Sequence, residues 1–359
     1  MKAKNFLENI DKLAQEYELN RIQVLEALKI GLISGCKKNY QVKNCCVSFD
    51  TDYQEFFVYK QYLVIDSLNE KKNNDHNSQI NFKKNSLMEL KEAQKIKKNV
   101  QIGEIIDILV DPKEFNFYAS KEFKNKFNEE LIKKRRTNIF NFFKKYENKI
   151  ISAEIISINN KSFTLKLEKN ITTFLLKKET LLNDNFDINE RIQVYVVKVQ
   201  EKNKNLDILV SRKNPNFIKE IFYEFIPEIQ EGIVKIMGLG REPSIRTKIG
   251  LLSTNDKVDA IGSCIGEKSA RIKSILNILN GEKINLFLWS EDIKELVINS
   301  LKPAEIDKII FINKNKKEVL VSVLQEQAPL AIGKLGINLK LSSKAINWNI
   351  KIEIIKKNN

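Results

Sequence analysis

Hydrophobic residues near the start of the chain recur at the period of an α-helix, which puts them on one face of each predicted helix. They are Phe6, Ile10, Leu13, Ile22, Leu25, Leu28 and Leu32. Asn20 interrupts the series at a place where its side chain can cap a second helix. The pattern therefore predicts helices over residues 5–37.

Strand-like runs follow. Alternating residues over 45–50 and the β-prone run FFVYKQYLVID predict a hairpin over residues 45–66. The other elements expected in this part are a polar loop at 69–79, a short helix at 86–95, a strand at 104–110 and a long helix from about Phe115 to Lys145.

Five short β-prone runs with polar turns between them occupy residues 149–213. This spacing is typical of a small five-stranded barrel of the OB type, which binds single strands through aromatic stacking and cations. The candidate stacking residues are Phe163, Phe174 and Tyr195, although a place in the barrel core is the favoured interpretation of each. The candidate phosphate contacts are Lys177, Lys178, Lys198 and Arg212.

One supersecondary order occurs twice after residue 213. Each unit reads helix, strand, strand, helix, tight turn, helix, strand. The first unit covers residues 214–288 and the second covers residues 289–359. A repeated order is stronger evidence than any single element, so the back of the chain is predicted to hold two related α+β domains. Trp289 and Trp348, each near the last strand of a unit, are expected to serve in packing.

The second unit contains a Gly-x-x-Gly turn, formed by Gly333, Lys334, Leu335 and Gly336, between two predicted helices. Glycines lack Cβ, so a nucleic-acid backbone can approach the turn closely. The helix that follows points unpaired N–H groups and its positive dipole end at a phosphate. Followed by Lys340 and a β-prone run, the turn is typical of an RNA-binding KH domain.

The matching turn of the first unit has lost its second glycine. Ser269 stands there, and a serine is restrained at positive φ, while Glu267 adds repulsion toward a phosphate. The candidate RNA contacts of this unit are Gly266, Lys268, Ser269, Arg271 and Lys273. We expect the second turn to hold RNA more firmly than the first.

Charge and cysteine content narrow the class of protein. The chain of 359 residues has a formal charge of +15. Residues 1–126 hold 21 basic and 18 acidic side chains, whereas the remainder holds 40 and 28, so the excess lies behind the first domain and favours a polyanionic partner. No Cys-x-x-Cys pair occurs and His76 is the single histidine, so reduced thiols are expected, without a metal or cofactor. No apolar run is long enough for a membrane helix, and the start lacks a secretory pattern, which predicts a cytoplasmic protein.

The junction between the barrel and the first unit resembles the NusA family of bacterial transcription factors. The segment LVSRKNPNFIKEIFYEFIPEIQEGIVKI, which begins at Leu209, is similar to that family's junction of S1 and first KH domains. Residues at the family's spacing are Ser211-Arg212, Pro215, Pro227 to Ile229, Gly232, Arg241-Glu242, Arg246 to Ile249, Val258-Asp259, Gly262, Cys264 to Gly266, Lys268, Arg271 and Leu279 to Ile284. The AIGKLGINLKLSSK block with Trp348 is similar to the second KH domain, and the resemblance covers essentially the whole chain.

This resemblance implies a multidomain α+β protein. Its parts are an N-terminal RNA polymerase-binding domain of mixed α/β structure (1–126), a linker helix (127–148), an S1-type OB barrel (149–213) and two tandem type II KH domains (214–288 and 289–359). It further implies a monomer that contacts core RNA polymerase, nascent single-stranded RNA and other Nus factors, and that modulates pausing, termination and antitermination. The glycines of both turns, Lys268, Arg271 and Lys334 inherit the RNA-contact role.

Two other kinds of protein carry the same domains: phosphorolytic ribonucleases and ribosome-associated proteins. S1 and KH domains accompany phosphorolytic ribonucleases, but those enzymes need a large core with clustered carboxylates, and no such cluster or nucleotide-binding loop occurs before the barrel. An enzyme is therefore not expected. A ribosome-associated or ribosome-assembly protein stays open as the alternative, because some ribosomal proteins carry KH domains.

Overall fold

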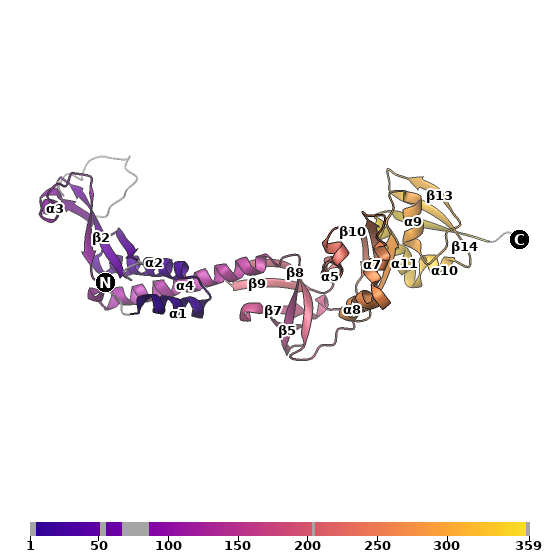
Figure 1. Ribbon diagram of the computed structural model, residues 1–359, viewed down its shortest axis with the longest axis horizontal. Coiled ribbons are helices and arrows are strands. Elements are labelled where there is room, and N and C mark those ends of the chain that lie inside the picture. The colour runs from indigo at the N-terminus through magenta and orange to yellow at the C-terminus, as the bar shows by residue number, and fades with distance from the viewer. Residues whose placement is uncertain (1–4, 51–54, 67–85, 203–204, 357–359) are drawn as a thin grey trace. The chain divides into compact units, whose positions relative to one another are not determined.

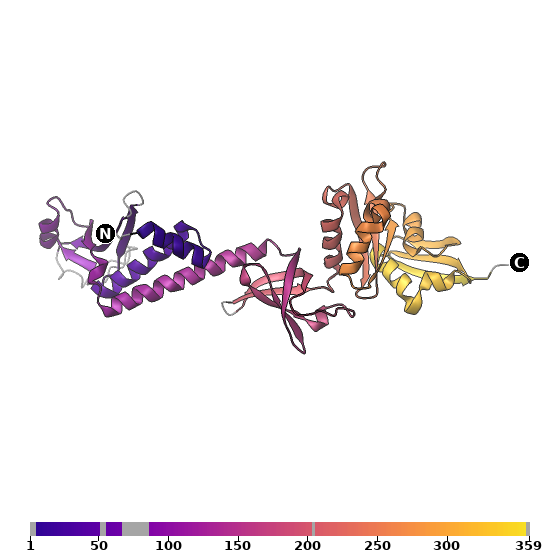
Figure 2. The same ribbon diagram turned by 60° about the horizontal axis from the view of Figure 1, so that its bottom comes forward.

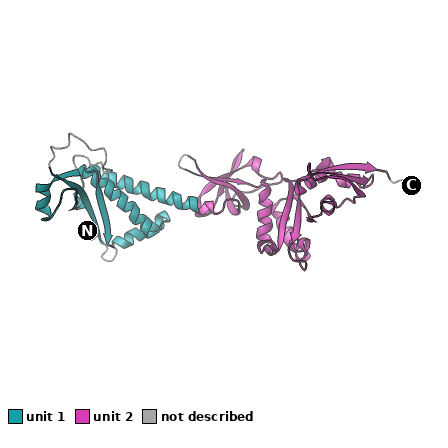
Figure 3. Cartoon of the chain, turned by 90° about the horizontal axis from the view of Figure 1, so that it is seen from above, with its two compact units in different colours: residues 1–141 teal, residues 142–359 magenta. Residues whose placement is uncertain are grey.

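The computed structural model describes residues 5–50, 55–66, 86–202 and 205–356. The chain forms two compact units, residues 1–141 and 142–359 (Figure 3). Among the helices of the described residues, none is long and apolar enough to cross a membrane. The loop predicted at 69–79 lies outside the described residues.

Two helices open the first unit, as predicted. Helix α1 runs Phe6–Tyr17 and helix α2 runs Arg21–Tyr40. Asn20 caps α2 as expected: its Oδ1 accepts a hydrogen bond from the Gln23 backbone N–H at 2.8 Å, and the Gln23 side chain accepts one from the Asn20 N–H. This reciprocal pairing satisfies two donors that a helix start otherwise leaves unpaired.

The predicted hairpin is confirmed as β1 (Cys45–Asp50) paired antiparallel with β2 (Glu55–Ile65). Strand β4 (Ile105–Val110) pairs with the same central strand β2. The helix predicted at 86–95 is partly wrong. Residues Leu87–Glu89 form strand β3, parallel to β2, and helix α3 covers only Leu90–Ile96, because Val64 and Met88 pair across the sheet.

The long predicted helix is α4, Phe117–Lys144. Its first half packs against α2 at two glycines of that helix (Figure 1). A Cβ built on Gly31 would lie 3.0 Å from Cβ of Phe127, and one on Gly35 would lie 2.8 Å from the Phe115 ring. Small residues thus let the helices approach closely, and the aromatic side chains of α4 complete the core of this unit.

The second unit begins with the predicted barrel (Figure 2). Its strands are β5 (Ile150–Ile158), β6 (Ser162–Lys166), β7 (Thr172–Leu176), β8 (Arg191–Lys202) and β9 (Asn205–Ser211), in the spatial order β7-β6-β5-β8-β9. The two edge strands meet, since the Thr173 hydroxyl of β7 donates to the Ile208 carbonyl of β9 at 2.6 Å. The nearly closed five-stranded sheet fits the expected OB barrel.

Two similar α+β modules follow, in the predicted order. The first comprises α5 (Pro215–Phe225), α6 (Pro227–Gln230), β10 (Val234–Glu242), β11 (Arg246–Ser253), α7 (Ala260–Ile265), α8 (Ala270–Ile278) and β12 (Lys283–Leu288). The second comprises α9 (Ile293–Leu301), β13 (Lys308–Asn313), β14 (Glu318–Leu324), α10 (Ala328–Ile332), α11 (Ile337–Ile346) and β15 (Asn349–Ile355). In each, the first two strands pair antiparallel and the third runs parallel to the second. The mixed α+β fold class is confirmed, and the domain boundaries stay a prediction.

Candidate nucleic-acid interface

The turn between α10 and α11 has the backbone that its glycines permit. Gly333 lies at φ 76° and ψ 169°, Leu335 at φ 55° and Gly336 at φ 72°. No atom lies within 4 Å of a Cβ built on Gly336. The turn is therefore open where a phosphate has to approach, and the Leu335 side chain stands beside it with 90% of its surface exposed.

The turn between α7 and α8 has nearly the same shape, although its second glycine is missing. Gly266 lies at φ 74° and ψ 172°, Lys268 at φ 48° and Ser269 at φ 63°. Ser269 thus adopts the left-handed conformation that Gly336 adopts in the other module, at some cost in strain. The substitution preserves the geometry of the turn, so the two turns differ mainly in charge.

Both helices that follow the turns start without a side-chain cap. Ser269, the residue before α8, accepts no backbone N–H through its hydroxyl, and Gly336, the residue before α11, has no side chain that could accept one. The first N–H groups of each helix therefore point at the turn with no capping oxygen from that residue. Such groups, together with the positive end of the helix dipole, favour an anion at this place.

The predicted cations near the turns fall into two groups. Within the described residues, no ion pair involves Lys268, Lys273 or Lys334. Arg271 is engaged, because its Nη1 lies 2.7 Å from Glu228 Oε2 and donates to the Ser263 carbonyl. The free lysines are thus better placed than Arg271 to meet a phosphate.

Lys340, a candidate contact of the second module, forms an ion pair with the first module. Its Nζ lies 2.8 Å from Glu242 Oε2 at the end of β10, with Lys344 of the same helix 3.9 Å from that oxygen. The hydrogen bond from Lys340 keeps the pKa of Glu242 below its ordinary value. Both lysines remain about half exposed, so a phosphate would have to compete with Glu242 for them.

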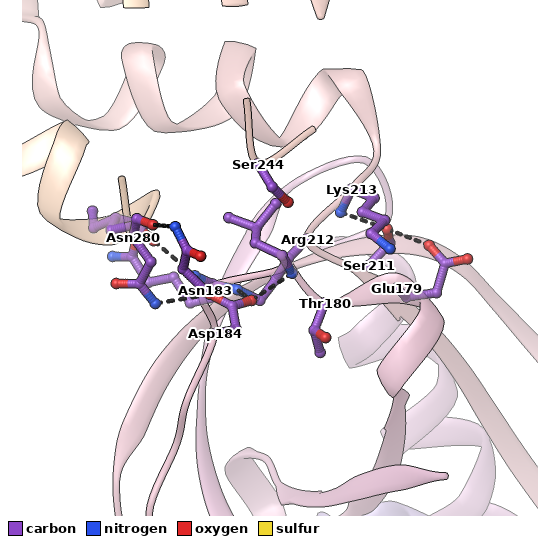
Figure 4. Close-up of polar contacts among 12 residues, drawn as sticks. Glu179, Thr180, Asn183, Asp184, Ser211, Arg212, Lys213, Ser244 and Asn280 are labelled. Carbon is purple, nitrogen blue, oxygen red and sulfur yellow. Dashed lines mark hydrogen bonds and ion pairs between the residues drawn. The ribbon is translucent and has the colours of Figure 1, made fainter. Parts of the chain in front are cut away.

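The interpretation of Arg212 as a phosphate contact is wrong. Only 2% of its surface is exposed, because its Nε lies 2.7 Å from Asp184 Oδ2 and its Nη1 donates to the Gln193 carbonyl at 2.6 Å (Figure 4). Its Nη2 also donates to the Ile278 carbonyl in α8. Four of its five N–H donors are engaged and the group is buried, so it is closed to RNA and joins the barrel to the first module instead.

Further polar contacts complete this junction. Asn280 of the first module donates to Asp184 Oδ1 at 2.8 Å and accepts from the Asn183 amide at 3.1 Å (Figure 4). The Leu182 N–H donates to the Ser244 hydroxyl at 2.8 Å. The carboxylate of Asp184 therefore receives donors from both sides, and sequence analysis did not single it out.

The two modules meet over a pair of glycines in β10. A Cβ on Gly240 would lie 2.1 Å from the Leu341 carbonyl oxygen of α11, and one on Gly238 would lie 2.2 Å from that of Ala345. Only a residue without a side chain allows α11 to lie this close to the strand. Neither glycine carried a recognisable signal in the sequence.

Lys248 is buried in the same contact. Its Nζ donates to the Ser300 carbonyl, to the Ser342 hydroxyl at 3.0 Å and to the Lys302 carbonyl at 3.2 Å. Burial lowers the pKa of Lys248 to about 7. A cavity of about 720 Å³ opens beside it. The lysine thus satisfies carbonyl oxygens of the second module and is not a surface cation.

The three aromatic candidates of the barrel differ in solvent exposure. Phe163 and Tyr195 are buried in the core, as the favoured interpretation held. For Phe174 that interpretation is wrong, because 60% of its surface is exposed on β7. Lys177, Lys178 and Lys198 are exposed. Phe174 is therefore the one candidate among the three that can stack on a base. Trp289 and Trp348 pack against the core of the second module, which confirms their expected role.

Family models described as the NusA N-terminal domain, the NusA-like first KH domain and the NusA-like second KH domain match residues 5–137, 212–289 and 293–359. Two relatives named transcription termination/antitermination protein NusA are each 30% identical to the chain. The one from Halalkalibacterium halodurans aligns over 97% of this chain and 87% of its own length, and the one from Bacillus subtilis over 98% and 91%. A third, from Thermus thermophilus, is 31% identical over 74% of this chain and 68% of its own length.

Proposed function

Because the chain belongs to the NusA family of transcription termination/antitermination proteins, we propose that it binds core RNA polymerase and nascent RNA, and that it modulates pausing, termination and antitermination. The barrel and both KH modules would hold the RNA, and the N-terminal unit would contact the polymerase. This role involves binding alone, with no catalytic step, and a cytoplasmic monomer suffices for it.

The pair of turns is the observation that carries the RNA-binding part. Each turn presents an uncapped helix start, a left-handed backbone at its exposed corner, and a lysine outside any ion pair of the described residues, Lys268 or Lys334. The basic excess behind the first domain adds long-range attraction for a polyanion. Phe174 supplies an exposed ring on the barrel.

Fluorescence anisotropy of labelled single-stranded RNA with the full chain tests this part. Lys334→Glu is expected to weaken binding roughly tenfold and to lower the salt slope by about 1, because a phosphate contact is lost. Lys316→Glu, the same charge change on an exposed residue in the strand turn of the same module, is the matched control. If both variants weakened RNA binding equally, the effect would come from the overall charge of the module, and a specific phosphate contact at Lys334 would be contradicted.

The two turns are proposed to differ in strength. Glu267 cancels the charge of Lys268 within the first turn, whereas Lys334 stands in the second turn without an acidic neighbour. Lys334→Glu should therefore weaken binding more than Lys268→Glu does. A larger loss from Lys268→Glu would contradict the proposed order.

Cross-linking of the full chain to core RNA polymerase, read by mass spectrometry, tests the polymerase part. Cross-links from residues before 142 are expected. Cross-links confined to residues 142–359 would contradict docking through the N-terminal unit. Retention of ribosomes, without polymerase, by a tagged full chain would instead favour the ribosome-associated alternative.

A further inference from the structure

Two cysteine thiols lie in contact in the first unit. Cys36 lies in the last turns of α2, and Cys45 is the first residue of β1. The Cys45 thiol donates to the Cys36 sulfur, with the two Sγ atoms 2.9 Å apart. A disulfide bond is about 2.05 Å long, so the sulfurs need to approach by only about 0.9 Å to bond.

The surroundings of the pair are electropositive. Lys60 is the direct cross-strand neighbour of Cys45, and its Nζ lies 4.6 Å from the Tyr40 ring centroid and 5.7 Å from that of Tyr62. The hydrogen bond from Cys45 lowers the pKa of Cys36, and the charges of Lys60 and Lys37 lower it further. The same hydrogen bond, together with burial, raises the pKa of Cys45. Of the two, Cys36 is therefore the thiol that gives up its proton more readily.

Access to the two sulfurs differs. Cys36 is fully buried, whereas Cys45 is half-buried at the start of its strand. A small molecule can therefore reach Cys45 first, and Cys36 lies behind it in position to react next. An accessible thiol backed by a buried thiol of lowered pKa is the arrangement in which one cysteine resolves a bond formed on the other.

We propose that Cys36 and Cys45 are a redox-active dithiol, which a small disulfide of the glutathione class converts into an intramolecular disulfide. Cys45 loses its proton as its sulfur attacks one sulfur of the small disulfide. The S–S bond of the small disulfide breaks, and the released small thiolate takes up that proton and leaves as a thiol. The Cys36 thiolate then attacks the Cys45 sulfur and releases the second. The protein loses two protons and two electrons, and the small disulfide gains both. The bond ties the end of α2 to β1 within one unit.

The chain supplies its own controls. Cys46 follows Cys45 on β1, and the alternation of a strand turns it to the opposite face, opposite Tyr59. Cys264 is fully buried in the first KH module. Neither has a sulfur partner in the described residues, so both should remain thiols when the pair oxidises.

The test equilibrates the full chain in buffers of reduced and oxidised glutathione. Acid quenching, alkylation and peptide mass spectrometry then identify the state of each cysteine. A Cys36–Cys45 disulfide should form in the oxidising buffers and disappear in the reducing ones, with alkylated Cys264. Glutathione attached to Cys45 should stay below about a tenth of the oxidised protein, because a neighbouring thiolate has a very high effective concentration.

Single substitutions distinguish the Cys36–Cys45 pair from the neighbouring Cys46. Cys46→Ser should leave the titration unchanged, whereas Cys36→Ser should convert the internal disulfide into a glutathione adduct on Cys45. The unsubstituted chain decides the matter even if Cys36→Ser fails to fold. Alkylation of both cysteines throughout the series, a stable glutathione adduct on Cys45 of the unsubstituted chain, or a Cys45–Cys46 bond would each overturn the proposal.

Discussion

Removing the charge of Asp184 should loosen the junction between the barrel and the first KH module. In Asp184→Asn the shape of the side chain is kept, but the Arg212 guanidinium loses its carboxylate while remaining buried. The Gln193 and Ile278 carbonyls still accept from it, although they carry no charge. Breaking one partner of a buried pair typically destabilises by about 3–5 kcal/mol, and we expect a loss at the low end of that range.

Hydrogen exchange read by mass spectrometry suits a chain of several domains, because a single unfolding transition is not defined for it. Amides of residues 180–186 and 275–282 report on the junction. A loss of about 3 kcal/mol in local opening free energy corresponds to roughly 100-fold faster exchange there. Exchange in the first unit should not change, which gives an internal reference in the same sample.

The chain offers a matched control for this substitution. Arg21 and Asp11 also lie 2.7 Å apart, but their side chains are 50% and 45% exposed. Asp11→Asn should leave exchange around α1 unchanged, because solvent screens an exposed pair. A double variant, Arg212→Met with Asp184→Leu, should recover much of the lost protection. The reasoning fails if Asp184→Asn and Asp11→Asn have equally small effects.

Three further predictions concern the same array. Lys248 has a pKa of about 7 when folded and a higher one when unfolded, so the unfolded state binds the extra proton and local stability should rise by about 2 kcal/mol from pH 7 to pH 9. Hydrogen exchange in α9 and α11, corrected for the pH dependence of intrinsic exchange, should show the rise, and Lys248→Met should abolish it. Gly240→Ala should weaken the contact between the KH modules, because the added Cβ would lie 2.1 Å from the Leu341 carbonyl oxygen. Faster hydrogen exchange in α11 would show this, and unchanged exchange there would refute it. Ser269→Gly should stabilise the first KH module by about 0.5–1 kcal/mol by relieving positive φ. Slower hydrogen exchange in α8 would show this, and faster exchange there would contradict it.

Elements with a clear period could be predicted from the sequence. The helical spacing of α2, the alternation in β1 and the repeated order of the KH modules each produce a pattern that local physics fixes. The turn at Gly333 is of the same kind, because its conformation depends on residues next to one another. Predictions failed where partners distant in sequence decide the outcome. Leu87–Glu89 became a strand because β2 offers it an edge, which no window around it reveals.

Charged residues illustrate the same limit at the candidate site. Arg212 and Lys177 both stand among barrel strands as exposed-looking cations, yet Arg212 is buried and Lys177 is exposed. The difference comes from Asp184, 28 residues earlier, and from a carbonyl 66 residues later. Composition can therefore predict how much positive charge a segment carries, but not which cations remain available to a ligand.

The way this chain places its arginines has a consequence for RNA selection. Four arginines lie behind residue 205, and of these Arg212 and Arg241 are buried in ion pairs with Asp184 and Glu282, while Arg271 is paired with Glu228. Arginine is the side chain that recognises bases and phosphates through paired, directional donors, whereas lysine acts as a point charge. In the part of the chain that the structure describes, the cations left unpaired on the two turns are the lysines Lys268 and Lys334. RNA binding by the proposed array should therefore depend steeply on salt, and its sequence preference should come from base stacking and the shape of the turns rather than from charged side chains.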